Sequence, residues 1–217
     1  MTATVTAHPR RDQEESAFAT ILADFVKRVP GAFAATLVDS EGECVDYAIA
    51  VQRKPHAEID PFDVKVAGAH WTIVLAEIAQ RPAFGTPQTI VCRGDKRSFI
   101  IRRLPDDYAL VVLLKKRAGF VSVVRAVDAC ERALAHEAAW TLPKGRGIWI
   151  AVDVETDERK RPIWLTMGAL SCAVEVLGTL TRLQKRERGF RVRLPSGGEL
   201  NLVREVGDRW YADEKLG

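Results

Sequence analysis

GAFAATLVDSEGECVDYAIA, residues 31–50, contains two apolar runs on either side of the short polar segment Asp39-Ser40-Glu41-Gly42. Apolar side chains alternate along both runs, which predicts two β-strands. Gly42 can supply the positive φ that a short hairpin loop needs. We therefore expect a β-hairpin, and the elements around it must show which fold it belongs to. The residues expected to share a face are Phe33, Ala35 and Leu37 in the first run and Val45, Tyr47, Ile49 and Val51 in the second.

Two helices flank this hairpin in the sequence. Apolar residues recur at helical spacing over residues 13–28, which predicts a helix that ends at Pro30-Gly31. A second helix is expected from Asp60 to about Arg81. Asp60 is a suitable N-cap, and Pro61 suits the first helical position.

Three more strands and a third helix complete the first part of the chain. Pro87 favours an edge position for the strand at 86–93, because proline cannot donate to a ladder. The run YALVVLL, 108–114, is apolar on both faces and predicts a central strand. With a strand at 97–104 and a helix at 119–138, residues 12–138 are predicted to form an α/β (α+β) sandwich. Its sheet has five mostly antiparallel strands, with helices on both faces.

The rest of the chain has a different pattern. The segment 139–147 contains Pro143, Gly145 and Gly147 and is interpreted as a linker. Residues 148–217 contain only strand-like runs, including 173–180 and a hairpin around Pro195-Ser196-Gly197-Gly198, which predicts a small antiparallel β-barrel-like domain. Residues 1–11 are expected to form a flexible tail.

Composition restricts the location and the class of partner. The chain of 217 residues has no apolar run of membrane-spanning length and no signal-peptide pattern at its N-terminus, so a cytoplasmic protein is expected. Its four cysteines are widely spaced and form no CxxC pair, which favours free thiols. Residues 1–139 hold 18 basic and 18 acidic residues, whereas 140–217 hold 14 and 11. The whole excess of +3 therefore lies in the second part.

Motifs for catalysis or cofactor binding are missing. The glycine-containing segments 94–96 and 144–147 do not fit a phosphate-binding loop. The four histidines, His8, His56, His70 and His136, show no metal-ligand spacing. No serine has the context of a nucleophile elbow. We expect no catalytic residue, no metal and no cofactor, and hence no enzyme.

A basic stretch in the second part suggests another class of partner. With the nearby aromatic residues Phe190, Trp210 and Tyr211, it is compatible with a nucleic-acid groove on a small barrel. The simpler interpretation is a solvated hairpin face, since Glu187 and Glu199 dilute the charge. The simpler interpretation is preferred. The basic residues are Arg182, Lys185, Arg186, Arg188, Arg191 and Arg193.

The second helix has two apolar stripes, although covering one face of a sheet needs only one. The first stripe, with Val64, Ala67, Trp71, Val74, Leu75 and Ile78, is expected to face the core. The second contains two alanines, which suggests the close approach of another helix. The edge strand is expected to run along the same junction. The predicted dimer or partner interface is Phe62, Val66, Ala69, His70, Ile73 and Ala76 of the helix, with Gln88, Ile90 and Cys92 of the strand.

The order of these elements resembles the roadblock family, the dynein light-chain type of domain. The resemblance rests on FATILADFVKRV, on PGAFAATLVDSEGECV, on the second helix and on TIVCRGDKRSFIIRRLPDDYALVVLL, and it covers about residues 16–138. It implies homodimers or heterodimers with the second helices side by side and edge strands joined. It also implies binding to Ras-like small GTPases or a scaffold role, with other roadblock proteins as further partners. Some bacterial members stimulate the GTPase of a cell-polarity switch without supplying an arginine finger.

From this resemblance we expect a non-enzymatic, dimeric regulator or scaffold of a Ras-like small GTPase in a bacterial cytoplasm. Two alternatives remain open. One is a nucleic-acid-associated dimer that uses the basic second domain, and the other is a ligand-sensing sandwich with an internal pocket.

Overall fold

The computed structural model describes residues 14–50, 59–83, 85–143, 146, 148–181, 183 and 186–213. By its contacts the chain divides into two compact units. The first comprises Met1–Phe120 with Glu137–Trp140, and the second Val121–His136 with Thr141–Gly217. The expected tail at 1–11 lies outside the described residues. Among the helices that are described, none is long and apolar enough to cross a membrane.

The first unit is built on a five-stranded sheet in which every neighbouring pair is antiparallel. The order is β2-β1-β5-β4-β3, so β5 is central and β3 lies at an edge, as the sequence predicts. Six of the seven residues of β5 are buried, because both faces of this strand are covered. The strands are β1 (Ala32–Val38), β2 (Cys44–Ile49), β3 (Thr89–Arg93), β4 (Arg97–Arg103) and β5 (Ala109–Lys115).

The predicted hairpin joins β1 to β2. The Asp39 carboxylate accepts the backbone N–H groups of Glu41 at 3.0 Å and Glu43 at 2.8 Å, which closes the turn with side-chain hydrogen bonds. Gly42 has a φ of 88°, the conformation expected of it. The turn is therefore set by its own sequence.

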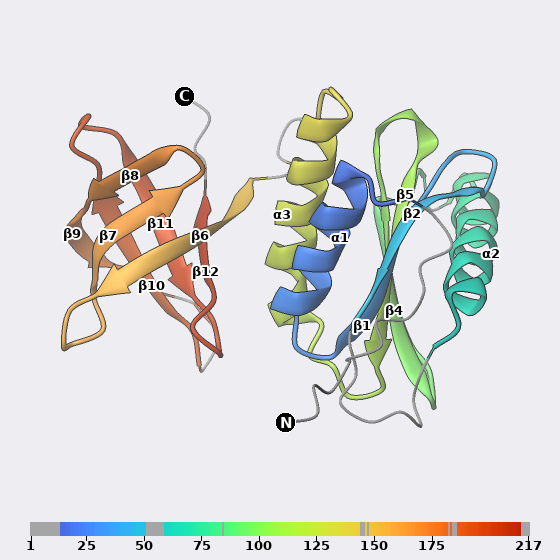
Figure 1. Ribbon diagram of the computed structural model, residues 1–217, viewed down its shortest axis with the longest axis horizontal. Helices are drawn as coiled ribbons and strands as arrows, with labels where there is room; N and C mark the ends of the chain where they lie inside the picture. Colours follow the sequence, from blue (N-terminus) through green and yellow to red (C-terminus); the bar gives the residue numbers. More distant parts are fainter. Residues whose placement is uncertain are drawn as a thin grey trace, which may run out of the picture. The chain divides into compact units, whose positions relative to one another are not determined.

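Helices α1 (Ala17–Arg28) and α2 (Pro61–Ala79) lie on opposite faces of this sheet (Figure 1). Helix α1 packs on β1 and β2, and α2 on β1, β2, β4 and β5. Ser16 caps α1 by accepting the N–H of Ala19 and donates to the buried Asp46 of β2 at 2.5 Å. Asp60 caps α2 by accepting the N–H of Phe62 at 2.9 Å, as the sequence predicts. The five-stranded sandwich is thus confirmed.

The second unit contains a curled, antiparallel sheet in the order β8-β7-β6-β12-β11-β10-β9. Its inner side chains, among them Leu165, Val192 and Leu202, form one apolar core. This sheet confirms the small β-domain of the predicted fold class. The strands are β6 (Trp149–Thr156), β7 (Pro162–Met167), β8 (Leu170–Ala173), β9 (Glu175–Thr179), β10 (Arg188–Arg193), β11 (Glu199–Arg204) and β12 (Trp210–Asp213).

The strand predicted at 173–180 is present as β9, but the preceding strand β8 was not predicted; the chain bends at Val174 between the two. Strand β8 pairs with β7, whereas β9 pairs with β10. The N–H of Val174 donates to the carbonyl of Ile163 at 3.0 Å, which holds the bend against β7. The two outermost strands of the sheet, β8 and β9, are therefore consecutive in the chain and joined at this bend. This connection gives the sheet its barrel-like curl.

Helix α3 (Val121–Glu137) contacts the strands of the second unit through charged side chains. Arg125 donates to Glu187 and to Glu205, each at 2.8 Å, and its guanidinium lies 5.0 Å from the ring centre of Trp149. Asp128 accepts the N–H of Ile148 at 3.1 Å. The domain limits 12–138 and 148–217 and the linker 139–147 stay a prediction.

Candidate partner interface

The buried line of α2 differs from the expected core stripe. Val64, Gly68, Thr72 and Leu75 are its buried residues, although Gly68 and Thr72 were not expected to face the core. A Cβ at Gly68 would lie 2.7 Å from Cγ2 of Val38, so glycine permits a close approach of the helix to β1. The hydroxyl of Thr72 donates to the carbonyl of Gly68 at 3.0 Å and needs no other polar partner in the core.

In the second stripe of α2, Phe62, Ile73 and Ala76 are exposed, whereas Val66 and Ala69 are half-buried. Its members recur at alternating spacings of four and three residues, the pattern of a helix-to-helix contact. Phe62 is 68% exposed and Ile73 59%, the two highest values among the large exposed apolar side chains of the described residues. We call this stripe the α2 seam. Its residues are Phe62, Val66, Ala69, Ile73 and Ala76.

The two flanks of α2 face different strands of the sheet. The Nζ atom of Lys65, a residue next to the seam, lies 5.3 Å from the ring centre of Tyr47 on β2. The seam is therefore on the side of α2 that faces β2. On the other flank of α2, Trp71 contacts Phe99 of β4, the neighbour of β3, with 4.9 Å between ring centres. The two flanks of α2 thus contact β2 and β4, and the predicted interface stays a prediction. On β3, Ile90 and Cys92 are half-buried; Gln88, just before the strand, and His70 of α2 are exposed.

A surface hollow of about 270 Å³ lies beside the C-terminal half of the seam. Thr72, Leu75, Ala76 and Ala79 line it from α2, with Arg103 from the end of β4. Arg103 forms an ion pair with Asp107, which also lines the hollow. The hollow thus has small and apolar side chains from the helix and a paired charge at its rim.

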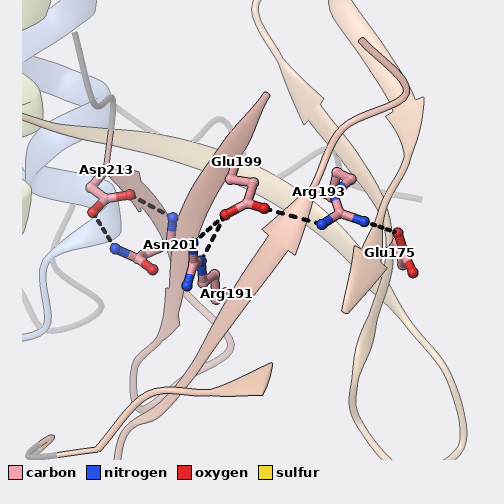
Figure 2. Close-up of polar contacts among 6 residues, drawn as sticks. All are labelled: Glu175, Arg191, Arg193, Glu199, Asn201 and Asp213. Carbon is pink, nitrogen blue, oxygen red and sulfur yellow. Dashed lines mark hydrogen bonds and ion pairs between the residues drawn. The ribbon is translucent and has the colours of Figure 1, made fainter. Parts of the chain in front are cut away.

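The basic face of the second unit has its charges partly paired. Arg191 donates to Glu199 at 2.8 Å, and Arg193 binds both Glu199 at 3.2 Å and Glu175 at 3.3 Å (Figure 2). The hydrogen bond from Arg191, with that from Arg193, lowers the pKa of Glu199. Next to these pairs, the carboxylate of Asp213 accepts hydrogen bonds from the backbone N–H of Asn201 at 2.5 Å and from its side-chain amide at 2.6 Å. Arg186 and Arg188 are exposed, and Arg182 and Lys185 lie outside the described residues.

Chemistry-bearing side chains do not gather elsewhere in the part of the chain that the structure describes. It contains no group of three or more His, Cys, Asp or Glu that could hold a metal ion. His70 and His136 are exposed, and the other two histidines lie outside the described residues. All four cysteines are free thiols, and burial raises the pKa of the Cys130 thiol. Gly94 closes the turn between β3 and β4, where its N–H donates to Arg97 at 2.9 Å.

Fold and surface together define an α/β sandwich whose helix α2 exposes Phe62 and Ile73, followed in the chain by a small β-unit. No family model and no curated protein matches the chain. Similar solved structures include a Roadblock/LC7 domain from Streptomyces avermitilis, with 14% identity and a TM-score of 0.46, covering 56% of this chain and 97% of that one. MglB from Myxococcus xanthus has 17% identity and a TM-score of 0.48, with 58% and 98% covered.

A third similar structure is MglC from Myxococcus xanthus, with 24% identity and a TM-score of 0.43, covering 56% of this chain and 99% of that one. The first of the three carries the name of the family that the sequence resembles. At these identities the likeness concerns the fold and transfers no residue role.

Proposed function

We propose that this chain is a non-enzymatic, dimeric regulator or scaffold that acts on a Ras-like small GTPase in a bacterial cytoplasm. The observation that carries the proposal is the α2 seam, which leaves Phe62 and Ile73 uncovered on a well-packed helix. Exposed apolar side chains at the spacing of a helix-to-helix contact suit a site that binds another protein. The GTPase as partner comes from the family resemblance of residues 16–138.

The seam suits contact with a second copy of the chain. A two-fold contact uses the same patch on both subunits, so each side chain contributes twice. A fully buried Phe or Ile contributes about 1.5–3 kcal/mol. Scaled by their exposed fractions and doubled, Phe62 and Ile73 would contribute about 4–8 kcal/mol to association.

The edge of β3 offers a separate surface. Among the described residues it pairs with β4 on one side only, so its other side has backbone groups that a partner strand could bind. Ile90 and Cys92, half-buried on this strand, lie on the flank of the sheet away from the seam. In the proposed function the seam forms the dimer, and the β3 edge binds a partner.

Light scattering and a binding assay test both parts. The purified chain of 24.1 kDa should elute at twice this mass. It should then form a complex with one of the Ras-like small GTPases encoded in the source genome, with a preference for the GDP-bound or the GTP-analogue-bound state. Phosphate release by that GTPase, with and without the chain, distinguishes regulation from scaffolding. A monomer at all concentrations, or no complex with any such GTPase, would contradict the proposal.

A further inference from the structure

An exposed tryptophan lies on the outer face of the sheet formed by β6, β7 and β8. Trp164 of β7 is 40% exposed, whereas the next residue, Leu165, is buried in the core of the second unit. Side chains of residues that are paired across an antiparallel sheet share a face. Trp164 pairs with Glu155 of β6 and with Ala173 of β8, so these three residues form one row on the outer face.

The indole ring of Trp164 is held by a hydrogen bond. Its Nε1–H donates to Oγ of Ser171 at 2.8 Å, and this hydroxyl lies 3.1 Å from the hydroxyl of Thr166. Thr166 and Ser171 form the next row of the same face, together with Asp153 of β6. The ring is therefore fixed by its polar edge, while part of its apolar surface stays open to solvent. A ring that is already ordered loses little entropy when a ligand binds to it.

Two exposed carboxylates, those of Asp153 and Glu155, flank this ring. Within the described part of the chain, neither carboxylate forms an ion pair or a side-chain hydrogen bond. Asp157, two residues after Glu155, differs because Arg161 neutralises it in an ion pair at 2.9 Å. The two charges give the outer face a negative potential, and the faces of an aromatic ring are negative as well. A cation is the ligand that both features attract.

A hollow of about 460 Å³ adjoins the row at Ala173, which belongs to both. Val174 and Leu194 line the hollow with apolar side chains that also pack against the core of the second unit. Its charged lining residues, Arg193 and Glu175, form an ion pair at 3.3 Å (Figure 2). The hollow therefore offers apolar surface directly beside the tryptophan and its carboxylates.

We propose that this outer face binds a segment of a partner protein in which an arginine is next to an apolar residue. The guanidinium stacks on the ring of Trp164 with its charge toward Glu155 and Asp153, and the apolar residue enters the hollow. Arginine suits the face better than lysine, because its planar guanidinium stacks on aromatic rings and binds carboxylates through several donors. Neither the dimer nor the GTPase of the proposed function is needed for this contact.

Binding of a fluorescently labelled peptide, Gly-Arg-Leu-Arg-Gly, to the full chain is the first test, followed by fluorescence anisotropy. The peptide has an arginine on each side of the leucine, so it can bind in either direction. Citrulline is an uncharged isostere of arginine, and the peptide that contains it should bind about tenfold more weakly. No binding of the arginine peptide, or equal binding of the citrulline peptide, would overturn the proposal.

Variants of the chain locate the contact. Trp164→Leu should raise the dissociation constant of the arginine peptide about threefold to thirtyfold, and Glu155→Gln about threefold. Because both side chains are exposed, these variants should keep the circular dichroism of the wild type. The matched controls are Val206→Ala, an apolar residue of the same unit that is 51% exposed, and Asp24→Asn, an exposed carboxylate of α1. Both controls should leave the constant unchanged, and equal constants for Trp164→Leu and Val206→Ala would contradict the proposal.

Two other occupants of the face would give different results. A neutral oligosaccharide can also stack on an exposed tryptophan. Binding of maltohexaose that Trp164→Leu removes, without binding of the arginine peptide, would therefore overturn the proposal. A second copy of the chain would appear as self-association that Trp164→Leu removes and Ile73→Arg does not, and this result would rule out a partner protein as the occupant.

Discussion

Replacement of Arg125 by methionine should lower the free energy of unfolding of the second unit. The decrease should be larger than that from removing an exposed ion pair of the same unit. Methionine keeps a long apolar side chain but removes the guanidinium that donates to Glu187 and Glu205. The side chains of these two carboxylates are only 6% and 1% exposed. Burial lowers the pKa of Arg125, but the hydrogen bonds and charges of the two glutamates outweigh this effect, and the net direction is upward. The charged pair is therefore the favoured state.

Removing one partner of a buried ion pair costs about 3–5 kcal/mol, because the other charge stays in the interior. Glu205 also binds Arg209 at 3.2 Å, which compensates part of the loss. We therefore expect a decrease of about 3 kcal/mol in the free energy of unfolding of the second unit. For a unit of this length, that is a fall of more than about 10 °C in its melting temperature.

Equilibrium urea unfolding, followed by tryptophan fluorescence and circular dichroism, measures the change. Arg191→Met is the matched control, since Arg191 is 57% exposed and pairs with Glu199 on the outer face. Exposed pairs contribute about 0–1 kcal/mol. If Arg125→Met and Arg191→Met differ by less than about 1 kcal/mol, the charged contacts of α3 do not stabilise this unit and the reasoning fails.

Three further predictions concern single positions. Ile73→Arg should give a folded monomer, because it puts two like charges into the proposed contact and Ile73 itself is mostly exposed; a dimer by light scattering would place the interface elsewhere. Gly68→Ala should cost about 1–3 kcal/mol of stability through overpacking against Val38; an unchanged urea midpoint would show that the helix can shift. Cys130 should react with a thiol reagent more slowly than the other three cysteines until the chain is denatured, since burial raises its pKa; equal native rates would contradict this.

Much of the first unit could be predicted because its elements have regular apolar periods. The hairpin at 31–50, the edge position of the strand with Pro87 and the central position of YALVVLL follow from alternation, proline chemistry and two-sided burial. Each of these signals depends on neighbouring residues only. Local patterns were therefore sufficient to place the five strands and the two helices of this sheet.

The features that the sequence analysis missed depend on distant contacts. The bend at Val174 is held by Ile163 on another strand, and no glycine or proline marks it. The ion pairs of Arg125 join residues 62 and 80 positions apart, which no periodicity reveals. The buried position of Gly68 was not predicted for a different reason. A search for apolar stripes does not count glycine, yet the absence of a side chain is what lets the helix approach the strand closely.

The two candidate surfaces differ in a way that bears on the class of partner. To bind a phosphate, Arg193 would have to give up hydrogen bonds to Glu199 and Glu175, so nucleic-acid binding at this face would begin with a cost. The α2 seam has no charged member, and covering it breaks no hydrogen bond of the described chain. Burial of Phe62 and Ile73 is favourable for any apolar partner of matching shape. The contrast supports the proposal that the partner of this chain is a protein and that it binds at α2.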